Sequence, residues 1–395
     1  MSDFQTGNAD PRLDRINQII TSHITDGLIP GAAMLIARRG KIVHRQALGR
    51  QAPDDATPMQ LDSIFRIYSM TKPIVSVAVM MLVEEGRLLL SHPVSRYLPQ
   101  LANLQVGLSL NGPEGQPALG LAPAQCEMTV QDLLRHTAGL TYGIFGNSLV
   151  KSCYSAAGVG GPDTSNDSLI DKLGTLPLAY QPGTTWEYSR ATDVLGALLE
   201  RLCGKPLDAV LAERIFRPLG MPDTGFWVPP EQQHRLAEGF AIDPVTHQAV
   251  HLLNVRERPQ FLSGGGGLVS TMHDYWRFAN MLLRGGELDG VRILSPKLVA
   301  LMTSDHLADL PLAKSGASYL PGPGYGFGLG FAVRTAAASA IPGSVGDYHW
   351  SGLAGTYFWN DPQEQLTAIW MVQAQEQREY YRQLFRNLVY AALLD

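Results

Sequence analysis

The sequence of 395 residues predicts an α/β protein of the α+β type. It is expected to consist of an antiparallel sheet flanked by helices, with an inserted, mostly helical domain. Two observations support this fold class. Apolar or alternating strand patterns occur near the start of the chain, at 32–37 and 41–47, and again near its end, at 328–333, 356–359 and 366–372. The region between these two groups shows helical periodicity and loops rich in proline and glycine.

The chain opens with a predicted helix and hairpin. Apolar residues recur at helical spacing over 12–25, and the pattern stops near Gly27. The two strand patterns that follow flank Gly40, which permits the tight turn of a β-hairpin. The chain therefore begins with a helix followed by antiparallel strands.

Further helices are predicted from apolar periodicity. The segment 72–85 is apolar nearly all round, which is typical of a helix buried at the centre of a domain. The other predicted helices lie at 129–136, 193–203, 273–283 and 378–394.

These patterns predict a discontinuous domain organisation. Residues 1–85 and 231–395 are expected to form the α/β domain, and residues 86–230 the mostly helical domain, in which few strand patterns occur. We expect the active site in the cleft between the two domains, because ligand sites prefer domain interfaces.

The composition excludes several classes of protein. Hydrophobic residues make up 45% of the chain and charged residues 17%, which predicts a folded core. The net charge of −5 indicates no basic stripe for nucleic acid or for an anionic membrane. No apolar stretch approaches the roughly 20 residues that span a bilayer. We therefore expect neither nucleic acid nor membrane as a partner, and the composition does not indicate an oligomeric state.

The N-terminus and the cysteines indicate a cytoplasmic protein. The first residues are polar and acidic, without the basic start and apolar run of a signal peptide. Cys126, Cys153 and Cys203 are widely spaced and odd in number, and they lack the spacing of zinc ligands. We expect reduced thiols, no metal and no cofactor.

Ser69 and Lys72 form the sharpest chemical feature of the sequence. Their spacing at a helix start puts the hydroxyl and the amine on one face, within reach of each other. A serine nucleophile needs a neighbour that accepts its proton, and desolvation can lower the pKa of a lysine enough for that role. By itself the pair also fits a helix cap beside a surface lysine. Its place at the start of the most apolar helix favours the catalytic interpretation.

Tyr188 is the second candidate. It follows the turn at Pro182-Gly183 and precedes the helix predicted at 193–203, so its phenol can face a cleft. A packed core aromatic is the alternative.

With these motifs the chain resembles the serine β-lactamase-like hydrolases, and most closely the family VIII carboxylesterases, which are similar to class C β-lactamases. The resemblance covers most of the chain, and its motifs keep the family's order and spacing. They are Ser69-Met70-Thr71-Lys72-Pro73, the segment 132–140 (DLLRHTAGL), Tyr188-Ser189, the segment 264–270 (GGGGLVS), the segment 325–330 (YGFGLG), and Trp350-Ser351-Gly352 followed by Gly355-Thr356.

The resemblance implies a β-lactamase-like fold and assigns roles to the matching residues. It implies that Ser69 is the nucleophile and that Lys72 and Tyr188 share its activation. It implies an oxyanion hole formed by the backbone N–H groups of Ser69 and Leu353. It also implies a substrate-binding strand, which is formed here by Trp350, Ser351 and Gly352.

Two departures from the lactamase pattern favour neutral esters. Trp350 stands where many β-lactamases have a lysine that attracts a carboxylate, and an indole offers an apolar wall with one donor. Arg190 stands in place of the asparagine of a Tyr-x-Asn motif. We expect a carboxylesterase that hydrolyses small, short-chain esters through an acyl-enzyme, with acyltransferase or weak β-lactamase side activity. The alternatives are a β-lactamase or D-amino-acid peptidase of the same fold, and a non-catalytic ligand sensor.

Other motifs are assigned structural roles. His136 and His349 have no recognisable spacing to Ser69. The glycine run 264–267 lacks the Lys-Ser/Thr of a phosphate loop and predicts close backbone packing near the cleft. The sequence contains no G-x-S-x-G motif, so a Ser-His-Asp enzyme of the α/β-hydrolase fold is not supported.

Overall fold

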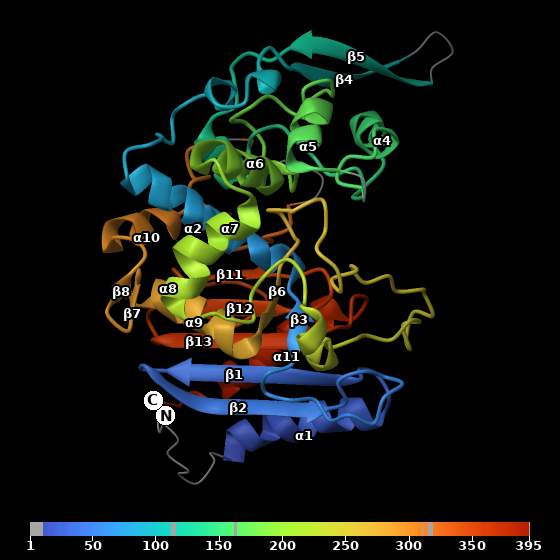
Figure 1. Ribbon diagram of the computed structural model, residues 1–395, viewed down its shortest axis with the longest axis vertical. Coiled ribbons are helices and arrows are strands. Elements are labelled where there is room, and N and C mark those ends of the chain that lie inside the picture. Colours follow the sequence, from blue (N-terminus) through green and yellow to red (C-terminus); the bar gives the residue numbers. More distant parts are fainter. Residues whose placement is uncertain (1–10, 112–115, 162–163, 311, 315–318, 395) are drawn as a thin grey trace.

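A seven-stranded antiparallel sheet forms the centre of the computed structural model, which describes residues 11–111, 116–161, 164–310, 312–314 and 319–394 (Figure 1). The strand order is β2-β1-β13-β12-β11-β10-β9, so the first and last segments of the chain pair at β1 and β13. The strands are β1 (Gly31–Arg38), β2 (Lys41–Gly49), β9 (Tyr325–Phe327), β10 (Ala332–Arg334), β11 (Tyr348–Ser351), β12 (Tyr357–Asp361) and β13 (Leu366–Val372). Residues 1–10, on which the expectation about a signal peptide rests, lie outside the described residues.

Strand β1 shows why this sheet forms between two layers. Its side chains alternate between two separate hydrophobic clusters: Ala33 and Leu35 belong to one, and Met34 and Ile36 belong to the other. A strand of period two that is apolar on both faces must be covered on both sides. Helices therefore cover both faces of the sheet.

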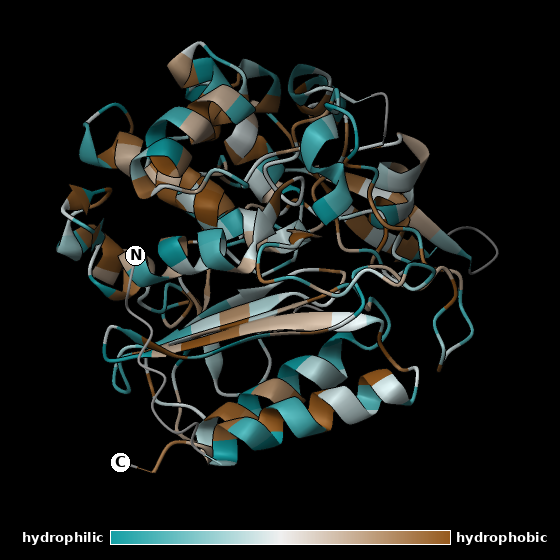
Figure 2. Cartoon of the chain, turned by 60° about the horizontal axis from the view of Figure 1, so that its bottom comes forward, coloured by the Kyte–Doolittle hydropathy of each residue, from teal (hydrophilic) through white to brown (hydrophobic). Residues whose placement is uncertain are grey.

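The two layers differ in origin. Helices α1 (Pro11–Thr25) and α11 (Arg378–Ala391) pack on one face, together with the cluster that contains Trp359 and Trp370 (Figure 2). Helix α9 (Met272–Leu283) packs on the other face against β12 and β13. Helix α2 (Thr71–Glu84) lies in the same large cluster as α9, and eleven of its residues are buried. This arrangement confirms the predicted α+β fold class.

In the sequence, most of the remaining elements come after α2 and before β9. The helices are α3 (Val130–Leu134), α4 (Leu149–Ala156), α5 (Asn166–Leu173), α6 (Ala191–Cys203), α7 (Leu207–Leu211), α8 (Arg217–Leu219) and α10 (Pro296–Met302). Short helical segments are η1 (Tyr68–Met70), η2 (Val94–Arg96), η3 (Pro99–Leu101), η4 (Ala212–Phe216) and η5 (Pro230–Arg235). Three small two-stranded sheets pair β3 (Ile64–Arg66) with β6 (Val269–Thr271), β4 (Gln105–Asn111) with β5 (Pro117–Pro123), and β7 (Glu287–Leu288) with β8 (Val291–Arg292).

Two strand predictions need correction. The hairpin of β4 and β5 lies in the region where few strand patterns were found. Glycines and prolines interrupt its sequence, and most of its residues are exposed or half-buried, so it lacks the apolar alternation of a core strand. Of the strand predicted at 328–333, residues 332 and 333 belong to β10. Residues 328–331 instead form the tight turn between β9 and β10, which is closed by a hydrogen bond of 2.8 Å from Gly328 N to Phe331 O.

Two further observations concern the whole chain. Within the described ranges, no helix combines the length and the apolar character needed to cross a membrane. Cys126, Cys153 and Cys203 are free cysteines. The division into domains at residues 85/86 and 230/231 stays a prediction.

Candidate active site

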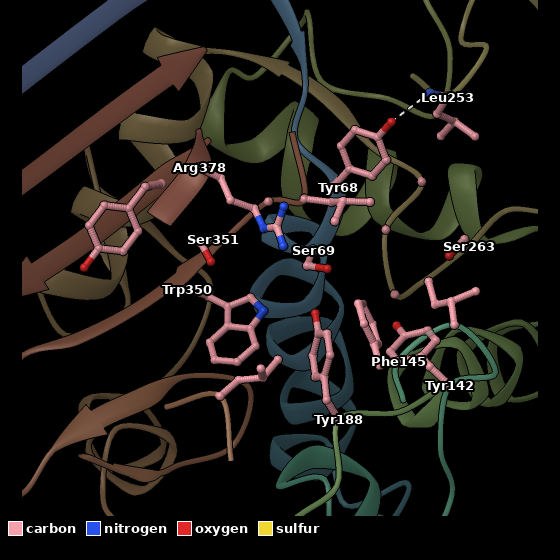
Figure 3. Close-up of a pocket in the computed structure, with 18 of the residues that line it drawn as sticks. Tyr68, Ser69, Tyr142, Phe145, Tyr188, Leu253, Ser263, Trp350, Ser351 and Arg378 are labelled. Carbon is pink, nitrogen blue, oxygen red and sulfur yellow. Dashed lines mark hydrogen bonds between the residues drawn. The ribbon is translucent and has the colours of Figure 1, made fainter. Parts of the chain in front are cut away.

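A strained turn presents Ser69 at the start of α2. Tyr68 has a φ of 43°, which is in the left-handed region that residues with a side chain rarely adopt. Its phenol oxygen accepts a hydrogen bond from Leu253 N at 2.7 Å, which anchors the turn. Ser69 lies just above the first turn of α2, and its side chain faces Tyr188 (Figure 3).

Lys72 lies one helical turn beyond Ser69 and is 1% exposed. Its ammonium donates hydrogen bonds to Ser69 Oγ at 3.3 Å, Tyr142 OH at 3.0 Å and Gly265 O at 2.6 Å. These three acceptors use all three N–H donors of the ammonium. The predicted pairing of Ser69 with Lys72 is therefore present as a direct contact.

The protonation of Lys72 differs from the expected one. Burial alone lowers its pKa, but Tyr142, Tyr188 and Asp193 outweigh burial, and the net shift is upward. Lys72 is therefore an ammonium at neutral pH, and the expectation that desolvation lowers its pKa is wrong. The reason is the polar network around the side chain, which cannot be read from the spacing of residues 69 and 72.

Asp193 organises that network from the first turn of α6. It is fully buried and accepts hydrogen bonds from Ser263 Oγ at 2.5 Å and Gly265 N at 2.9 Å. A Cβ at Gly265 would lie 2.9 Å from the Asp193 carboxylate, so only glycine fits there. The glycine run 264–267 is thus closely packed beside the cavity, as predicted, and its carbonyl at Gly265 also binds Lys72.

Tyr188 lies in the loop before α6 and is 8% exposed. Its ring centre is 4.6 Å from Lys72 Nζ, and its ring contacts those of Trp186, Trp350 and Tyr142 at 5.2–6.0 Å. Its hydroxyl points toward Ser69 (Figure 3). The structure therefore brings the three predicted catalytic residues together.

Tyr142 is a site residue that the sequence reasoning missed. Its hydroxyl accepts a hydrogen bond from Lys72, and burial raises its pKa to about 12. The guanidinium of Arg190 lies over its ring, at 4.8 Å from the centre, and is held by Asp193 and by Val159 O. Tyr142 comes two residues after the 132–140 motif, and no fixed spacing relates it to Ser69.

A buried ion pair ties the segments that hold the two tyrosines. Glu187, which precedes Tyr188, accepts a hydrogen bond from Thr141 Oγ1 at 2.7 Å and pairs with Lys151 Nζ at 2.9 Å. Thr141 in turn precedes Tyr142. Glu187, Thr141 and Lys151 are all buried, so this contact fixes the two segments relative to each other.

The predicted substrate-binding strand is the end of β11. Gly352 lies against the backbone of Ile67, where a Cβ would approach the carbonyl oxygen to 2.4 Å. The turn after it is closed by hydrogen bonds from Gly352 N to Thr356 O and from Gly355 N to Gly352 O. Arg382 of α11 also donates to the Gly352 carbonyl.

Trp350 and Leu353 both line the cavity. Trp350 is 5% exposed, and its indole Nε1 has no hydrogen-bond partner within the described part of the chain. Leu353 lies in the turn closed by Gly352 and Thr356, beside Ser69 on the cavity wall. The residues expected to bind substrate and to provide the oxyanion hole thus surround one space.

That space is a cavity of about 1060 Å³ lined by Ser69, Tyr142 and Tyr188. Arg378 of α11 also lines it, with its guanidinium near Ser69 and Ser351 (Figure 3). Arg378 Nη1 donates to Gln375 O at 2.7 Å, and Nε lies 3.8 Å from Glu379. Arg378 therefore contributes a cation to the same cavity in which Trp350 stands in place of a lysine.

His136 is buried, and His349 is half-buried and lines the cavity. Desolvation holds the pKa of each imidazole well below its usual range. His136 lies 3.2 Å from Ser189 Oγ and packs against Trp186 and Phe327. In the described residues, no group of three or more His, Cys, Asp or Glu side chains has the arrangement of a metal site.

Comparison with known proteins defines the class to which this site belongs. The profile of the Beta-lactamase family matches residues 16–392. Protein Rv1367c of Mycobacterium tuberculosis is 38% identical over 366 residues, which cover 90% of this chain and 89% of that protein. Esterase EstB of Burkholderia gladioli is 31% identical over 363 residues, which cover 86% of this chain and 85% of that protein.

A solved structure is similar along the full length. EstCE1, described as a hydrolase with promiscuous acyltransferase activity, superposes with a TM-score of 0.80 and 27% identity, over 97% of this chain and 100% of that one. The chain therefore belongs to the Beta-lactamase family and, within it, to the family VIII esterases that its motifs resemble. Its fold is that of the β-lactamase-like hydrolases.

Proposed function

We propose that this protein is a serine carboxylesterase that hydrolyses small carboxylic esters through an acyl-enzyme on Ser69. The observation that supports it most is the contact of Ser69 Oγ with a fully engaged Lys72 ammonium, opposite the hydroxyl of Tyr188. The esterase and hydrolase names of the relatives EstB and EstCE1 agree with an ester carbonyl as the target.

Tyr188 accepts the proton of Ser69 in its phenolate form, so that the O–H bond of Ser69 breaks as the O–H bond of Tyr188 forms. The Lys72 ammonium, 4.6 Å from the Tyr188 ring centre, stabilises that negative charge. Lys72 has no free lone pair as an ammonium, so it acts by donating a hydrogen bond and by its positive charge.

The remaining steps follow from the geometry of the cavity. Ser69 attacks the carbonyl carbon, and the backbone N–H groups of Ser69 and Leu353 hold the oxyanion. Tyr188 gives the proton to the departing alkoxide. Water then attacks the carbonyl carbon of the acyl-enzyme while Tyr188 accepts its proton. The acid leaves as Ser69 Oγ takes the proton back from Tyr188. A second alcohol in place of water would give acyl transfer.

A second candidate function is hydrolysis of an acyl compound that bears a carboxylate, such as a β-lactam or a D-amino-acid peptide. The absence of a lysine at Trp350 argues against it, but the guanidinium of Arg378 near Ser351 favours it. The neutral ester remains the first choice because Trp350 forms an apolar wall beside Tyr188, at 5.5 Å between ring centres.

Two assays on the purified protein test these proposals. We expect turnover of p-nitrophenyl butyrate that is lost in Ser69→Ala, and slow turnover of a chromogenic cephalosporin. Full ester turnover by Ser69→Ala would exclude the serine mechanism. Cephalosporin turnover at comparable efficiency would favour the second candidate function. No reaction with either substrate would favour the alternative that the protein is a non-catalytic ligand sensor.

A further inference from the structure

The cavity is large for a small ester. Its volume is about 1060 Å³, whereas cavities of roughly 300–1000 Å³ already hold drug-sized ligands. An ester of a short acid and a short alcohol fills only the part next to Ser69. The rest of the cavity must hold either water or a larger group of the substrate.

The mouth of the cavity exposes apolar side chains from three separate loops. Ile144, Leu253 and Leu320 all line the cavity and are 68%, 42% and 55% exposed. They are far apart in the sequence, so their convergence on one rim is a property of the fold. Contiguous apolar groups that face water on a folded protein mark a binding surface for an apolar partner.

Aromatic and aliphatic side chains continue this rim toward the nucleophile. Phe145, Phe261 and Ile341 line the cavity and are half-buried against the main core. Phe145 contacts both site tyrosines, with ring centres 5.5 Å from Tyr142 and 6.0 Å from Tyr188. An apolar wall thus runs from Tyr188 past Phe145 to Ile144 at the mouth.

Most charged groups around the cavity are engaged by protein partners. Arg190 pairs with Asp193, Arg258 pairs with Asp208, and Arg382 pairs with Glu379. Arg378 also lines the cavity, and its guanidinium points toward Ser69 in the view of Figure 3. Glu257 also lines the cavity and is exposed to solvent. The apolar side chains of Phe145, Ile144 and Leu320 therefore form the part of the cavity that suits an uncharged, apolar group.

We propose that the substrate is an ester with a bulky, apolar alcohol part that fills this outer chamber. This inference rests on the proposed function, because Tyr188 is there the proton donor to the departing alcohol. The alcohol must leave past Tyr188, and the surface beyond Tyr188 is the apolar wall of Phe145 and Ile144. Ser69 Oγ forms the bond to the carbonyl carbon, and the alcohol leaves with the proton from Tyr188. Water then yields the acid and restores Ser69.

A set of three esters tests the assignment. Ethyl butyrate is the small reference ester. 2-(1-Naphthyl)ethyl butyrate adds bulk on the alcohol side, and ethyl dodecanoate adds bulk on the acyl side. All three esters release an alkyl alcohol. We expect kcat/KM for the naphthylethyl ester to exceed that for ethyl butyrate by about a hundredfold or more, given about fourfold per buried CH₂. A larger gain with ethyl dodecanoate would overturn the assignment to the alcohol, and equal rates for all three would overturn the proposal.

Rim variants localise the effect. In Ile144→Ser and Leu320→Ser we expect KM for the naphthylethyl ester to rise about three- to tenfold, while kcat/KM for ethyl butyrate stays unchanged. The matched control is Leu89→Ser, because Leu89 is 51% exposed but lies away from the cavity. If the rim variants behave like the control, the chamber does not bind the alcohol. A wild-type protein inactive on every ester would instead contradict the proposed function itself.

Discussion

Two ionic clusters in this protein are similarly buried, but only one of them contacts Ser69 in the cavity. In the first, Asp347 accepts hydrogen bonds from Arg334 Nε at 2.9 Å and from Arg386 Nη2 at 2.5 Å, and all three side chains are at most 1% exposed. In the second, Lys72 and Asp193 are linked through Gly265.

The difference lies in the acceptors. The two arginines donate to Asp347, to the phenol of Tyr357 and to backbone carbonyls. Tyr357 also lines the cavity, but none of these hydrogen bonds ends on Ser69. One of the three hydrogen bonds of Lys72 ends on Ser69, which lines the cavity. Burial and a perturbed pKa therefore do not identify a site by themselves, and neither does a hydrogen bond from a buried cation to a hydroxyl that lines the cavity. What distinguishes the second cluster is that its cation contacts a serine hydroxyl, the candidate nucleophile.

The largest expected effect is on catalysis, from Lys72→Met. The substitution keeps the volume of the side chain but removes the hydrogen bond and the charge beside Ser69. We expect kcat for p-nitrophenyl butyrate to fall by about a thousandfold or more, since this charge acts on the reacting atoms. Steady-state kinetics measure it, and circular dichroism checks that the variant is folded. A fall of less than tenfold would show that the second cluster is structural like the first.

Asp347→Asn is the complementary change in the first cluster. It leaves two buried guanidinium groups without their carboxylate, so we expect the free energy of unfolding to fall by about 3–5 kcal/mol. Urea denaturation measures this loss, and kcat of the folded fraction is expected to stay within about threefold of wild type. A variant with wild-type stability and low kcat would reverse the comparison.

Glu187→Gln tests the contact that joins the two tyrosine segments. Gln keeps a hydrogen bond to Thr141 but leaves the ammonium of Lys151 without its carboxylate, and the segments of Tyr142 and Tyr188 can then shift. We expect kcat to fall about ten- to a hundredfold, with KM changed less than threefold, because small misplacements of reacting groups are costly.

The matched control for this variant is Glu364→Gln, which breaks the ion pair with Arg38 at the sheet edge and is expected to leave kcat unchanged. Equal behaviour of the two variants would mean that the Lys151–Glu187 pair does not position the tyrosines.

The smallest expected effect concerns stability, at a buried carboxyl away from the cavity. Burial raises the pKa of Asp274 to about 6. The folded state then holds this proton more tightly than the unfolded state, so stability falls as pH rises from about 4 to about 6, by about 2–3 kcal/mol in total. In Asp274→Asn we expect this contribution to the pH dependence to vanish, as measured by urea denaturation at several pH values. Asp309→Asn, an exposed control, should keep the wild-type slope, and an unchanged slope in Asp274→Asn would contradict the assignment.

The sequence was sufficient for features that depend on short-range periodicity. The apolar run at 32–37 and the run at 41–47 predict a β-hairpin, and the structure pairs β1 with β2 as antiparallel strands. The contact of Ser69 with Lys72 follows from one helical turn. The motifs also placed Tyr188 correctly beside this pair, through the resemblance to the family.

Features that depend on tertiary contacts could not be predicted in this way. Tyr142 reaches Lys72 across 70 residues, and Glu187 meets Lys151 across a loop and two helices. The upward pKa shift of Lys72 depends on Asp193, which reaches the site through Gly265. Arg378 lines the cavity from the last helix. The cavity therefore contains a cation, although Trp350 stands at the position where many β-lactamases have a lysine.

The central claim is that Ser69 forms a covalent acyl intermediate, and peptide mass spectrometry after reaction with a fluorophosphonate probe tests it most directly. We predict one label per chain, on the peptide that contains Ser69, and loss of this label in Ser69→Ala with the fold intact. Pre-incubation with p-nitrophenyl butyrate should slow the labelling, because the butyryl group occupies the same oxygen. A label on another residue, or equal labelling of the Ser69→Ala variant, would contradict the account.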